Sequence, residues 1–444
     1  MFRLKLLFLF LVVAFQLTVN ACTIVAVSGR ATADGRPLLL KNRDSKTWDI
    51  KIRIGQGVNY KYLCQCIATN GSAYSGYNET GFAIINSHSY NMPNRDYAWN
   101  AYIMQMALER CASVDEFEFM LNTLSKPISV CANYGVMDAQ GNVSIIEVNA
   151  YTHTRYNAND AECGYLIRTN YSFSQDTTGV SLVSPTSYPR YKIASSYLED
   201  AFLTCGYISK EHLLVLSRCL ENCEGNDLRN MASFDENAYT PIDFRYYVPR
   251  YTTTSMMIIE GLKTGEQPNL TVAWTAIGPP VATVTVPYLI TPSRSLPKKA
   301  KKGEDGHAWL CYQGQMLKNS CFVDSISIDL AKLYNLRGTG VMQRVMAIEE
   351  EVLGRGKELV ARMRTGEATD NDVVQYYAWV DDYVEERYTQ IGNYSNDNMG
   401  SGCDAISHSY EEEMKYFNIL GRRVSTVSPN AIVKRSGNIG IILN

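Results

Sequence analysis

The chain has 444 residues, of which 46% are hydrophobic and 20% charged, so it is long enough to bury a large core. Its formal net charge is −3, unlike the strongly basic composition of nucleic-acid-binding proteins, and we expect no nucleic-acid partner. A short run at 297–307, first basic and then acidic, is typical of a solvated linker.

The first 21 residues have the three parts of a secretory signal peptide. Arg3 and Lys5 form a positively charged start, residues 6–15 are apolar, and Val19 and Ala21 occupy the positions before a cleavage site. The apolar stretch is too short to cross a membrane, and no later segment has about 18 uninterrupted apolar residues. The sequence therefore predicts an exported protein, periplasmic or secreted, without a transmembrane helix.

Apolar runs separated by turns predict a series of β-hairpins after Cys22. In the first, the turn contains Asp34-Gly35, a pair that favours a tight reversal between strands. Two longer stretches have apolar residues at helical spacing. Hairpins that alternate with amphipathic helices predict an α+β fold with helices outside antiparallel sheets. We expect hairpins at 22–40 and 72–90, a helical stretch at 99–124, a hairpin at 134–151, a helical stretch at 190–220, and strands at 252–261 and 269–278.

The sequence changes character after Pro297. Residues 308–390 are predicted to be mostly helical, and we interpret them as a helical appendage to the preceding domain. The predicted organisation is a signal peptide at 1–21, a main domain at 22–297, a helical extension at 298–390 and a C-terminal segment at 391–444 of unassigned structure.

The chain contains twelve cysteines, eleven of which follow Cys22. An odd number leaves at least one thiol unpaired, so no regular disulfide framework is predicted, although export permits disulfides. Cys64 with Cys66, or Cys219 with Cys223, resembles half of a metal site. Neither pair has a partner pair at zinc-like spacing, so we predict no bound metal.

Cys22 directly follows the predicted cleavage site, and three interpretations of it are open. The first is a buried strand residue, because cysteine is among the most buried residue types. The second is a lipid anchor, because residues 19–22 loosely fit a bacterial lipoprotein box, although an apolar strand begins where lipoproteins usually have a polar tether. The third is the mature N-terminus. There a free amine (pKa about 7.7–8.0) beside a thiol (pKa about 8.5) supplies the nucleophile with its own acid–base partner.

The residues after Cys22 resemble those of the N-terminal-nucleophile (Ntn) amide hydrolases related to choloylglycine (bile-salt) hydrolase, penicillin V acylase and isopenicillin-N acyltransferase. Cys22-Thr23 and the string "ATADGRPLLLKNRD" resemble most the autoproteolytic acyltransferase/hydrolase branch. The likeness covers roughly residues 22–287. It implies a four-layer αββα sandwich, with two antiparallel sheets between helices and Cys22 as the nucleophile at the start of a strand.

The string "KNRD" at 41–44 lies on the partner strand of the first predicted hairpin. In the family, the aspartate that matches Asp44 holds and orients the N-terminal amine. The bile-salt enzymes have arginine at the position of Lys41. Lysine keeps a positive charge near the thiol, which favours the thiolate, but it lacks the planar fork of arginine.

Three further strings carry the resemblance. "YLIRTNYSF" at 165–173 resembles a Thr-Asn motif whose asparagine, here Asn170, donates its amide to the oxyanion. Asn170 also begins a glycosylation sequon, and a catalytic Asn170 carries no sugar. "SYPRY" at 187–191 resembles the motif that brings an arginine into the site, although a surface position at a helix start is the alternative for Arg190. "YNETGFAIINSHSYN" resembles the loop that supplies a second oxyanion donor through a backbone N–H, where Asn86 fits the acyltransferase branch better than His88.

The resemblance implies an exported cysteine hydrolase that cleaves linear amides through a thioester acyl-enzyme, with acyl transfer as a variant of the same chemistry. Its expected partner is a small-molecule N-acyl amide, and neither a metal nor an organic cofactor is needed. Two alternatives stay open: a secreted cysteine dipeptidase of the related family, and a non-catalytic, lipid-anchored binding protein on the same fold. The sequence leaves open whether the protein forms a homo-oligomer.

Overall fold

The structure is a computed structural model that describes residues 21–93, 96–175 and 186–397, together with four short strands near the C-terminus. Its side chains are described as far as Ile391. The predicted signal peptide, apart from Ala21, and most of the segment at 391–444 therefore lie outside the described residues. The four strands form a small sheet: β16 (Tyr416–Asn418), β17 (Arg423–Val424), β18 (Ile432–Arg435) and β19 (Asn438–Ile441).

A six-stranded antiparallel sheet, sheet A, begins at Cys22. As the first hairpin predicts, β1 (Cys22–Val27) pairs with β2 (Leu38–Asp44). On its other side, β1 pairs with β10, and β2 pairs with β12, which comes from far along the chain. The remaining strands of sheet A are β10 (Tyr165–Arg168), β12 (Thr253–Glu260), β13 (Val272–Ala276) and β14 (Val286–Tyr288).

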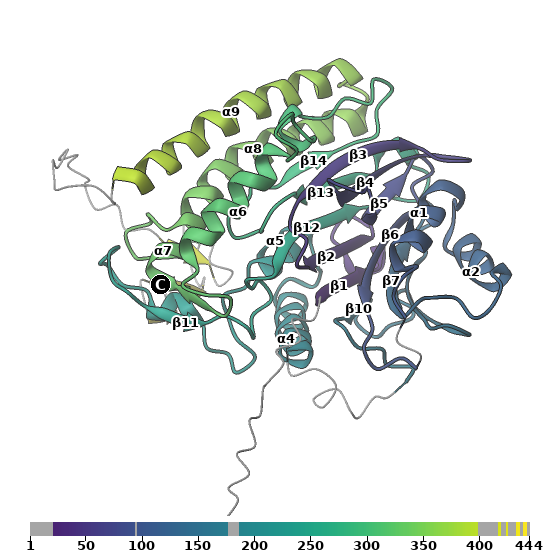
Figure 1. Ribbon diagram of the computed structural model, residues 1–444, viewed down its shortest axis with the longest axis horizontal. Coiled ribbons are helices and arrows are strands. Elements are labelled where there is room, and N and C mark those ends of the chain that lie inside the picture. The colour runs from purple at the N-terminus through teal and green to yellow at the C-terminus, as the bar shows by residue number, and fades with distance from the viewer. Residues whose placement is uncertain are drawn as a thin grey trace, which may run out of the picture.

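A second antiparallel sheet, sheet B, has seven strands in sequence order. The hairpins predicted at 72–90 and 134–151 form its centre as β5–β6 and β7–β8. Because β1 contacts β6, β7 and β8, the two sheets pack face to face (Figure 1). The strands are β3 (Ile50–Gln56), β4 (Lys61–Ile67), β5 (Ala73–Asn78), β6 (Ala83–His88), β7 (Ala132–Met137), β8 (Val143–Val148) and β9 (His153–Asn157).

Helices cover the outer face of each sheet, which confirms the predicted αββα arrangement (Figure 1). The stretch predicted at 99–124 forms two helices on sheet B, α1 (Asn100–Arg110) and α2 (Val114–Thr123), because the Ser113 hydroxyl accepts from the backbone N–H of Glu116 and starts a new helix. The stretch predicted at 190–220 likewise divides into α4 (Ser187–Cys205) and α5 (Lys210–Ser217) on sheet A. Gly206 ends α4 with a left-handed φ of 76°.

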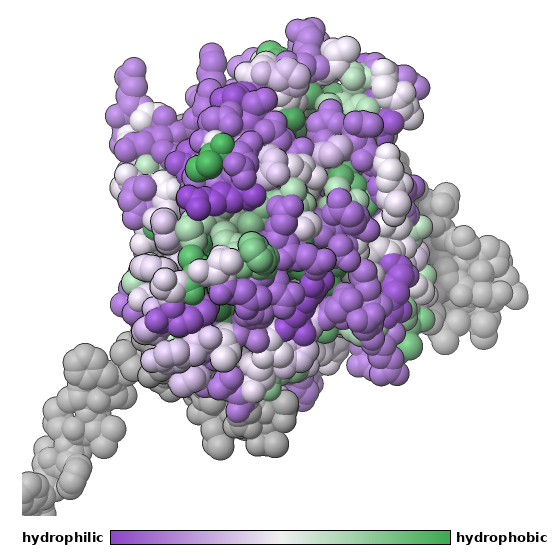
Figure 2. All heavy atoms as spheres, turned by 90° about the vertical axis from the view of Figure 1, so that its right-hand side faces the viewer, coloured by the Kyte–Doolittle hydropathy of each residue, from purple (hydrophilic) through white to green (hydrophobic). Residues whose placement is uncertain are grey.

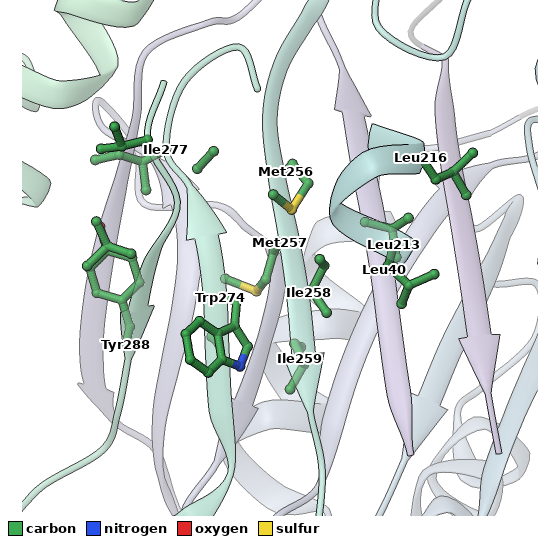
Figure 3. Close-up of a cluster of buried hydrophobic side chains, with 14 of the residues drawn as sticks. Leu40, Leu213, Leu216, Met256, Met257, Ile258, Ile259, Trp274, Ile277 and Tyr288 are labelled. Carbon is green, nitrogen blue, oxygen red and sulfur yellow. The ribbon is translucent and has the colours of Figure 1, made fainter. Parts of the chain in front are cut away.

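The main hydrophobic core lies between the two sheets and beneath the helices on sheet A. Every residue of β1 and β2 is buried, because sheet B covers one face of these strands and helices cover the other. Figure 3 shows this packing, with Leu213 and Leu216 of α5 lying beside Leu40 of β2 and near the apolar side chains of β12. This burial explains the nearly continuous apolar run of the first strand.

Residues 309–391 are mostly helical, as predicted, but their side chains share the core of the sheets. The hydroxyls of Tyr377 and Tyr388 accept hydrogen bonds of 3.0 Å from the backbone N–H groups of Leu289 and Val284. These helices are therefore integral to the folded body and do not form a separate appendage, while the domain boundary at 297 stays a prediction. They are α6 (Trp309–Cys321), α7 (Leu330–Leu333), α8 (Val341–Thr365) and α9 (Asp370–Asp397).

The predicted linker at 297–307 is only partly solvated. Residues 301–305 are exposed, but the backbone N–H groups of Lys298 and Lys299 donate to the Asp381 carboxylate on α9 at 2.7 and 2.9 Å. A two-stranded ribbon of β11 (Pro241–Asp243) and β15 (Ser327–Asp329) links the region after α5 to the end of α6. The face that carries α1 and α2 is mostly polar, with apolar side chains in small separate groups (Figure 2).

The described residues show neither a membrane helix nor a metal cluster. None of their helices is long and apolar enough to span a bilayer. No group of three or more His, Cys, Asp or Glu side chains among them is placed to hold a metal ion. The eleven cysteines described are all free thiols, and Cys403 lies outside this part of the chain.

Candidate active site

Cys22 is the first residue of β1 and is held on both sides of its backbone. Its N–H donates to Asn170 Oδ1 at 3.0 Å, and its carbonyl oxygen accepts from Arg190 Nη1 at 2.7 Å. Only 6% of the residue is exposed. Asn170 and Arg190, which come from two separate sequence motifs, therefore both contact Cys22.

Asn170 follows β10 and is completely buried. Its Oδ1 accepts from the Cys22 N–H and from Arg190 Nη2 at 2.9 Å, and both partners are donors only, so this orientation of the amide is fixed. Its Nδ2, the donor that the resemblance assigns to the oxyanion, donates to the carbonyl of His88 at 3.0 Å, so the oxyanion role of Asn170 stays a prediction. Complete burial in this network is incompatible with a glycan on Asn170.

Arg190 lies in the first turn of α4 and is completely buried, so the surface alternative is wrong. Besides Cys22 and Asn170, its guanidinium donates to Thr23 Oγ1 at 2.9 Å and to the Thr186 carbonyl at 3.0 Å. Burial, reinforced by repulsion from Arg250, lowers the pKa of Arg190 to about 10. The arginine therefore remains charged at neutral pH and fixes the start of β1.

Lys41 and Asn86 meet across the gap between the two sheets. Lys41 Nζ donates to Asn86 Oδ1 at 2.6 Å and to the Tyr74 carbonyl at 2.8 Å. Burial lowers the pKa of Lys41 to about 8, while the nearby Cys22 acts to raise it. The other side of the Asn86 amide, Nδ2, is buried without a hydrogen-bond partner. An unused buried donor costs about 1–3 kcal/mol, so this amide is available for an acceptor that enters the site.

Asp44 ends β2 and is buried, but its described partners differ from the expected one. Its carboxylate accepts from Arg250 Nε at 2.8 Å and from Thr253 Oγ1 at 2.6 Å, whereas the Cys22 N–H donates to Asn170. The difference has a simple cause: with residue 21 attached, the nitrogen of Cys22 is an amide with a single hydrogen. A free amine has further hydrogens to offer, so the Asp44–amine contact stays a prediction for the cleaved chain.

Arg250 and Arg43 are site residues that the sequence analysis did not single out. Arg250 lies just before the predicted strand at 252–261, but only the pairing of β12 with β2 brings it to Asp44. Arg43 is part of "KNRD" and lies directly opposite Cys22 in the strand register. Its Nη1 donates to the Thr47 carbonyl and to Thr254 Oγ1, and its guanidinium lies 4.3 Å from the centre of the Tyr74 ring.

His88 ends β6, and its ring stacks on Tyr97 with centroids 5.0 Å apart. Burial, followed by the charges of Lys41 and Arg43, lowers the pKa of His88 to about 4. His88 is therefore uncharged near the two cations, which agrees with assigning the site role to Asn86 and not to His88. Tyr90 lies close by, and burial together with the negative charge of a Cys22 thiolate raises the pKa of its phenol.

A separate cavity of about 480 Å³ lies at the opposite end of the β1–β2 hairpin, between its turn and the α4–α5 connection. Asp34, Lys210 and Glu260 are among its lining residues. It does not adjoin Cys22, and its charges are already paired: Lys210 Nζ lies 3.4 Å from the Glu260 carboxylate. The chemistry at Cys22 therefore does not depend on this cavity.

Part of the chain is similar to known proteins. Residues 31–218 match the family model described as acyl-coenzyme A:6-aminopenicillanic acid acyl-transferase. Among solved structures, a Caenorhabditis elegans N-acylethanolamine-hydrolyzing acid amidase ortholog is 12% identical over 56% of this chain and 93% of its own, with a TM-score of 0.33. A conjugated bile acid hydrolase from Clostridium perfringens is 13% identical over 62% and 93%, with a TM-score of 0.35. Penicillin V acylase from Agrobacterium tumefaciens is 15% identical over 61% and 86%, with a TM-score of 0.32.

The structural likenesses are weak, and a comparison with curated protein sequences gave no match. The classification therefore depends on the family match, on two antiparallel sheets packed between helices, and on the cluster of predicted residues around the start of β1. On these grounds, residues 31–218 are similar to that acyl-transferase family, and the body has the αββα arrangement of an Ntn hydrolase.

Proposed function

We propose that the mature protein is an exported cysteine amidase that begins at Cys22 and cleaves linear N-acyl amides, with acyl transfer as a second outcome of the same intermediate. The observation that carries the proposal is the anchoring of Cys22 on both sides of its backbone by Asn170 and Arg190. A structural cysteine in a strand does not require two buried polar side chains dedicated to its own backbone.

In the first half of the reaction, the Cys22 thiolate attacks the amide carbonyl. The new C–S bond forms as the carbonyl electron pair moves onto oxygen, and the unpartnered Nδ2 of Asn86 donates to that oxyanion. The C–N bond then breaks, and the leaving nitrogen takes a proton from the Cys22 ammonium group. The product is a thioester between the acyl group and Cys22, with the amine of Cys22 now neutral.

In the second half, the neutral amine takes a proton from water as the water oxygen attacks the thioester. The C–S bond breaks, the carboxylic acid leaves and the thiolate is restored. A bound amine in place of water gives acyl transfer. Asn170 Oδ1 already accepts from the Cys22 nitrogen, which supports a role in orienting the amine, and Asp44 is the second acceptor that the resemblance implies.

The experiment is to express the full chain in an exporting host and to determine the intact mass and N-terminal sequence. We expect residues 1–21 to be absent, Cys22 to be free, and N-acyl amides to be hydrolysed. Cys22→Ala should abolish turnover, whereas Cys219→Ala is the matched control, because burial raises the pKa of that thiol to about 12 and makes it inert. Full activity of Cys22→Ala refutes the proposal.

The same measurements separate the two alternatives. A lipid-modified Cys22 leaves no amine for acid–base chemistry and favours the anchored binding protein. A free Cys22 with turnover of dipeptides in preference to N-acyl amino acids favours the dipeptidase.

A further inference from the structure

The charges around Cys22 and Asp44 are strongly unbalanced. Five basic side chains lie in this region with at most 9% of each residue exposed. Only one of them, Arg250, forms an ion pair with a carboxylate, that of Asp44. The described hydrogen-bond acceptors of the other four are neutral carbonyl, amide or hydroxyl oxygens. The five are Lys41, Arg43, Arg190, Arg250 and Lys318.

Two of these cations share the face of sheet A that carries the Cys22 thiol. Cys22 pairs with Arg43 in the register of β1 and β2, and Arg43 pairs with Ser255 of β12, so the three side chains project to the same side. Ser255 Oγ donates across the gap to Gln65 of sheet B at 3.0 Å, which identifies this side as the space between the sheets. Lys41 is two residues before Arg43 on the same face and reaches Asn86 of sheet B.

This space also contains hydrogen-bond donors that the protein itself does not use. Arg43 Nε, Asn86 Nδ2 and Gln65 Nε2 are each buried without a partner. The Gln65 amide is held in this orientation because its Oε1 accepts from both Ser75 and Ser255. Three unused buried donors beside two cations form a surface that is complementary to an anion.

The nucleophile alone does not balance these charges. A Cys22 thiolate neutralises one of the two positive charges of Lys41 and Arg43, and the oxyanion of the tetrahedral intermediate replaces that negative charge without adding another. At least one buried positive charge is therefore left at every step, and both are left in the thioester, which has neither a thiolate nor an oxyanion. A buried unpaired charge is costly. A substrate that brings its own negative charge removes the imbalance.

We propose that the substrate carries a carboxylate close to the scissile amide and that Arg43 is the residue that binds it. This inference rests on the proposed amidase function and adds the class of substrate. Two kinds of compound place a carboxylate there: an N-acyl amino acid carries it on the amine side, and the amide of a dicarboxylic acid carries it on the acyl side.

The test uses pairs of substrates that differ only in this charge. An N-acylglycine is compared with its glycinamide, and an N-glutaryl amide with the N-pentanoyl amide of the same amine. A charge-assisted hydrogen bond predicts a kcat/KM ratio of about 10- to 150-fold in favour of the carboxylate in one of the two pairs, and that pair identifies the side. Ratios near one in both pairs overturn the proposal. Failure to cleave any member of either pair instead contradicts the amidase function itself.

Arg43→Gln should reduce the preferred ratio to within about threefold of one. The matched control is Arg53→Gln on β3, because Arg53 also lies over a tyrosine ring, that of Tyr62 at 5.5 Å, and bonds to Gln105 away from Cys22. This control should keep the full ratio. If Arg43→Gln does not fold, binding of the free N-acylglycine and its amide to the Cys22→Ala protein replaces the kinetic test. Equal affinities of the two compounds for the Cys22→Ala protein, or an unchanged kcat/KM ratio in Arg43→Gln, would show that Arg43 does not bind the carboxylate.

Discussion

Replacing Arg190 with methionine separates the contribution of this residue to the site from its contribution to stability. Methionine fills much of the same volume but donates no hydrogen bond. Thr23 retains a hydroxyl that can turn to another partner, and Asn170 Oδ1 keeps the Cys22 N–H. The buried acceptor that loses its arginine donor is the backbone carbonyl of Cys22, and the half-buried carbonyl of Thr186 loses one hydrogen bond.

The expected loss of stability is small because two effects oppose one another. The loss of this hydrogen bond at the buried Cys22 carbonyl costs about 1–3 kcal/mol, and the loss at the half-buried Thr186 carbonyl costs less. Burial lowers the pKa of Arg190 to about 10, which means that the charged form is destabilised by about 3 kcal/mol, and replacing the cation removes this penalty. The net change in the free energy of unfolding is therefore within about 2 kcal/mol of zero. The loss of activity should be larger, about 100-fold or more in kcat/KM, because the nucleophile is no longer held in place.

The control is Arg218→Met, which removes another buried arginine. Arg218 forms a bidentate ion pair with Glu349 at 2.5 and 2.6 Å, away from Cys22. Breaking it leaves a buried carboxylate and should cost about 3–5 kcal/mol with little effect on kcat/KM at a temperature where the variant is folded. The assays are urea unfolding and hydrolysis of an N-acyl amide by the cleaved protein. Activity of Arg190→Met within tenfold of the wild type refutes the reasoning.

Three further predictions test other parts of the molecule. Because burial lowers the pKa of Lys41 to about 8, the unfolded chain binds more protons than the folded one above pH 8, so stability should rise between pH 8 and 9.5. Lys41→Met should weaken this rise in urea unfolding, and an unchanged slope contradicts the assignment. Asn86→Asp keeps an acceptor for Lys41 but removes the unpartnered donor, so kcat should fall by about 10²–10³ without loss of melting temperature; unaltered kcat argues against an oxyanion role. In α8, Gly354→Ala should stabilise by about 0.5–1 kcal/mol, because nothing lies within 4 Å of an added Cβ. Gly356→Ala should destabilise by about 1–3 kcal/mol, because its Cβ would lie 2.7 Å from Pro287. In calorimetry the melting temperatures of the two variants should therefore change in opposite directions, and equal changes would show that α8 does not pack on Pro287.

Local patterns in the sequence predicted the hairpins correctly, because strand alternation and turn residues are properties of neighbouring positions. The string "KNRD" lies on the partner strand of the β1–β2 hairpin, as predicted, and the register places Arg43 opposite Cys22. The two helical stretches were predicted in the right places, but each is divided in the structure. Their breaks depend on single residues, the cap at Ser113 and the left-handed Gly206, within otherwise continuous apolar patterns.

The helical region at 309–391 shows why packing is harder to infer than secondary structure. Its periodicity predicted helices but gave no sign of the surface against which they pack. The apolar faces of α8 and α9 pack on the β13–β14 region, and tyrosines of α9 bind backbone groups there that the sheet leaves unpaired. These contacts join residues 88 and 104 positions apart, so nothing in the local sequence specifies them.

The sequence alone determined the strand that starts at Cys22, the order of the site residues and the resemblance that implies their chemistry, because these depend on residues close together in the chain. Only the tertiary structure decided which groups contact one another: Lys41 with Asn86, Asp44 with Arg250, and Cys22 with Asn170 and Arg190. It also revealed the excess of buried positive charge. The contacts and the charge excess both depend on how strands far apart in the chain pair and on which faces of the two sheets meet. Burial of the whole core decides this pairing and packing.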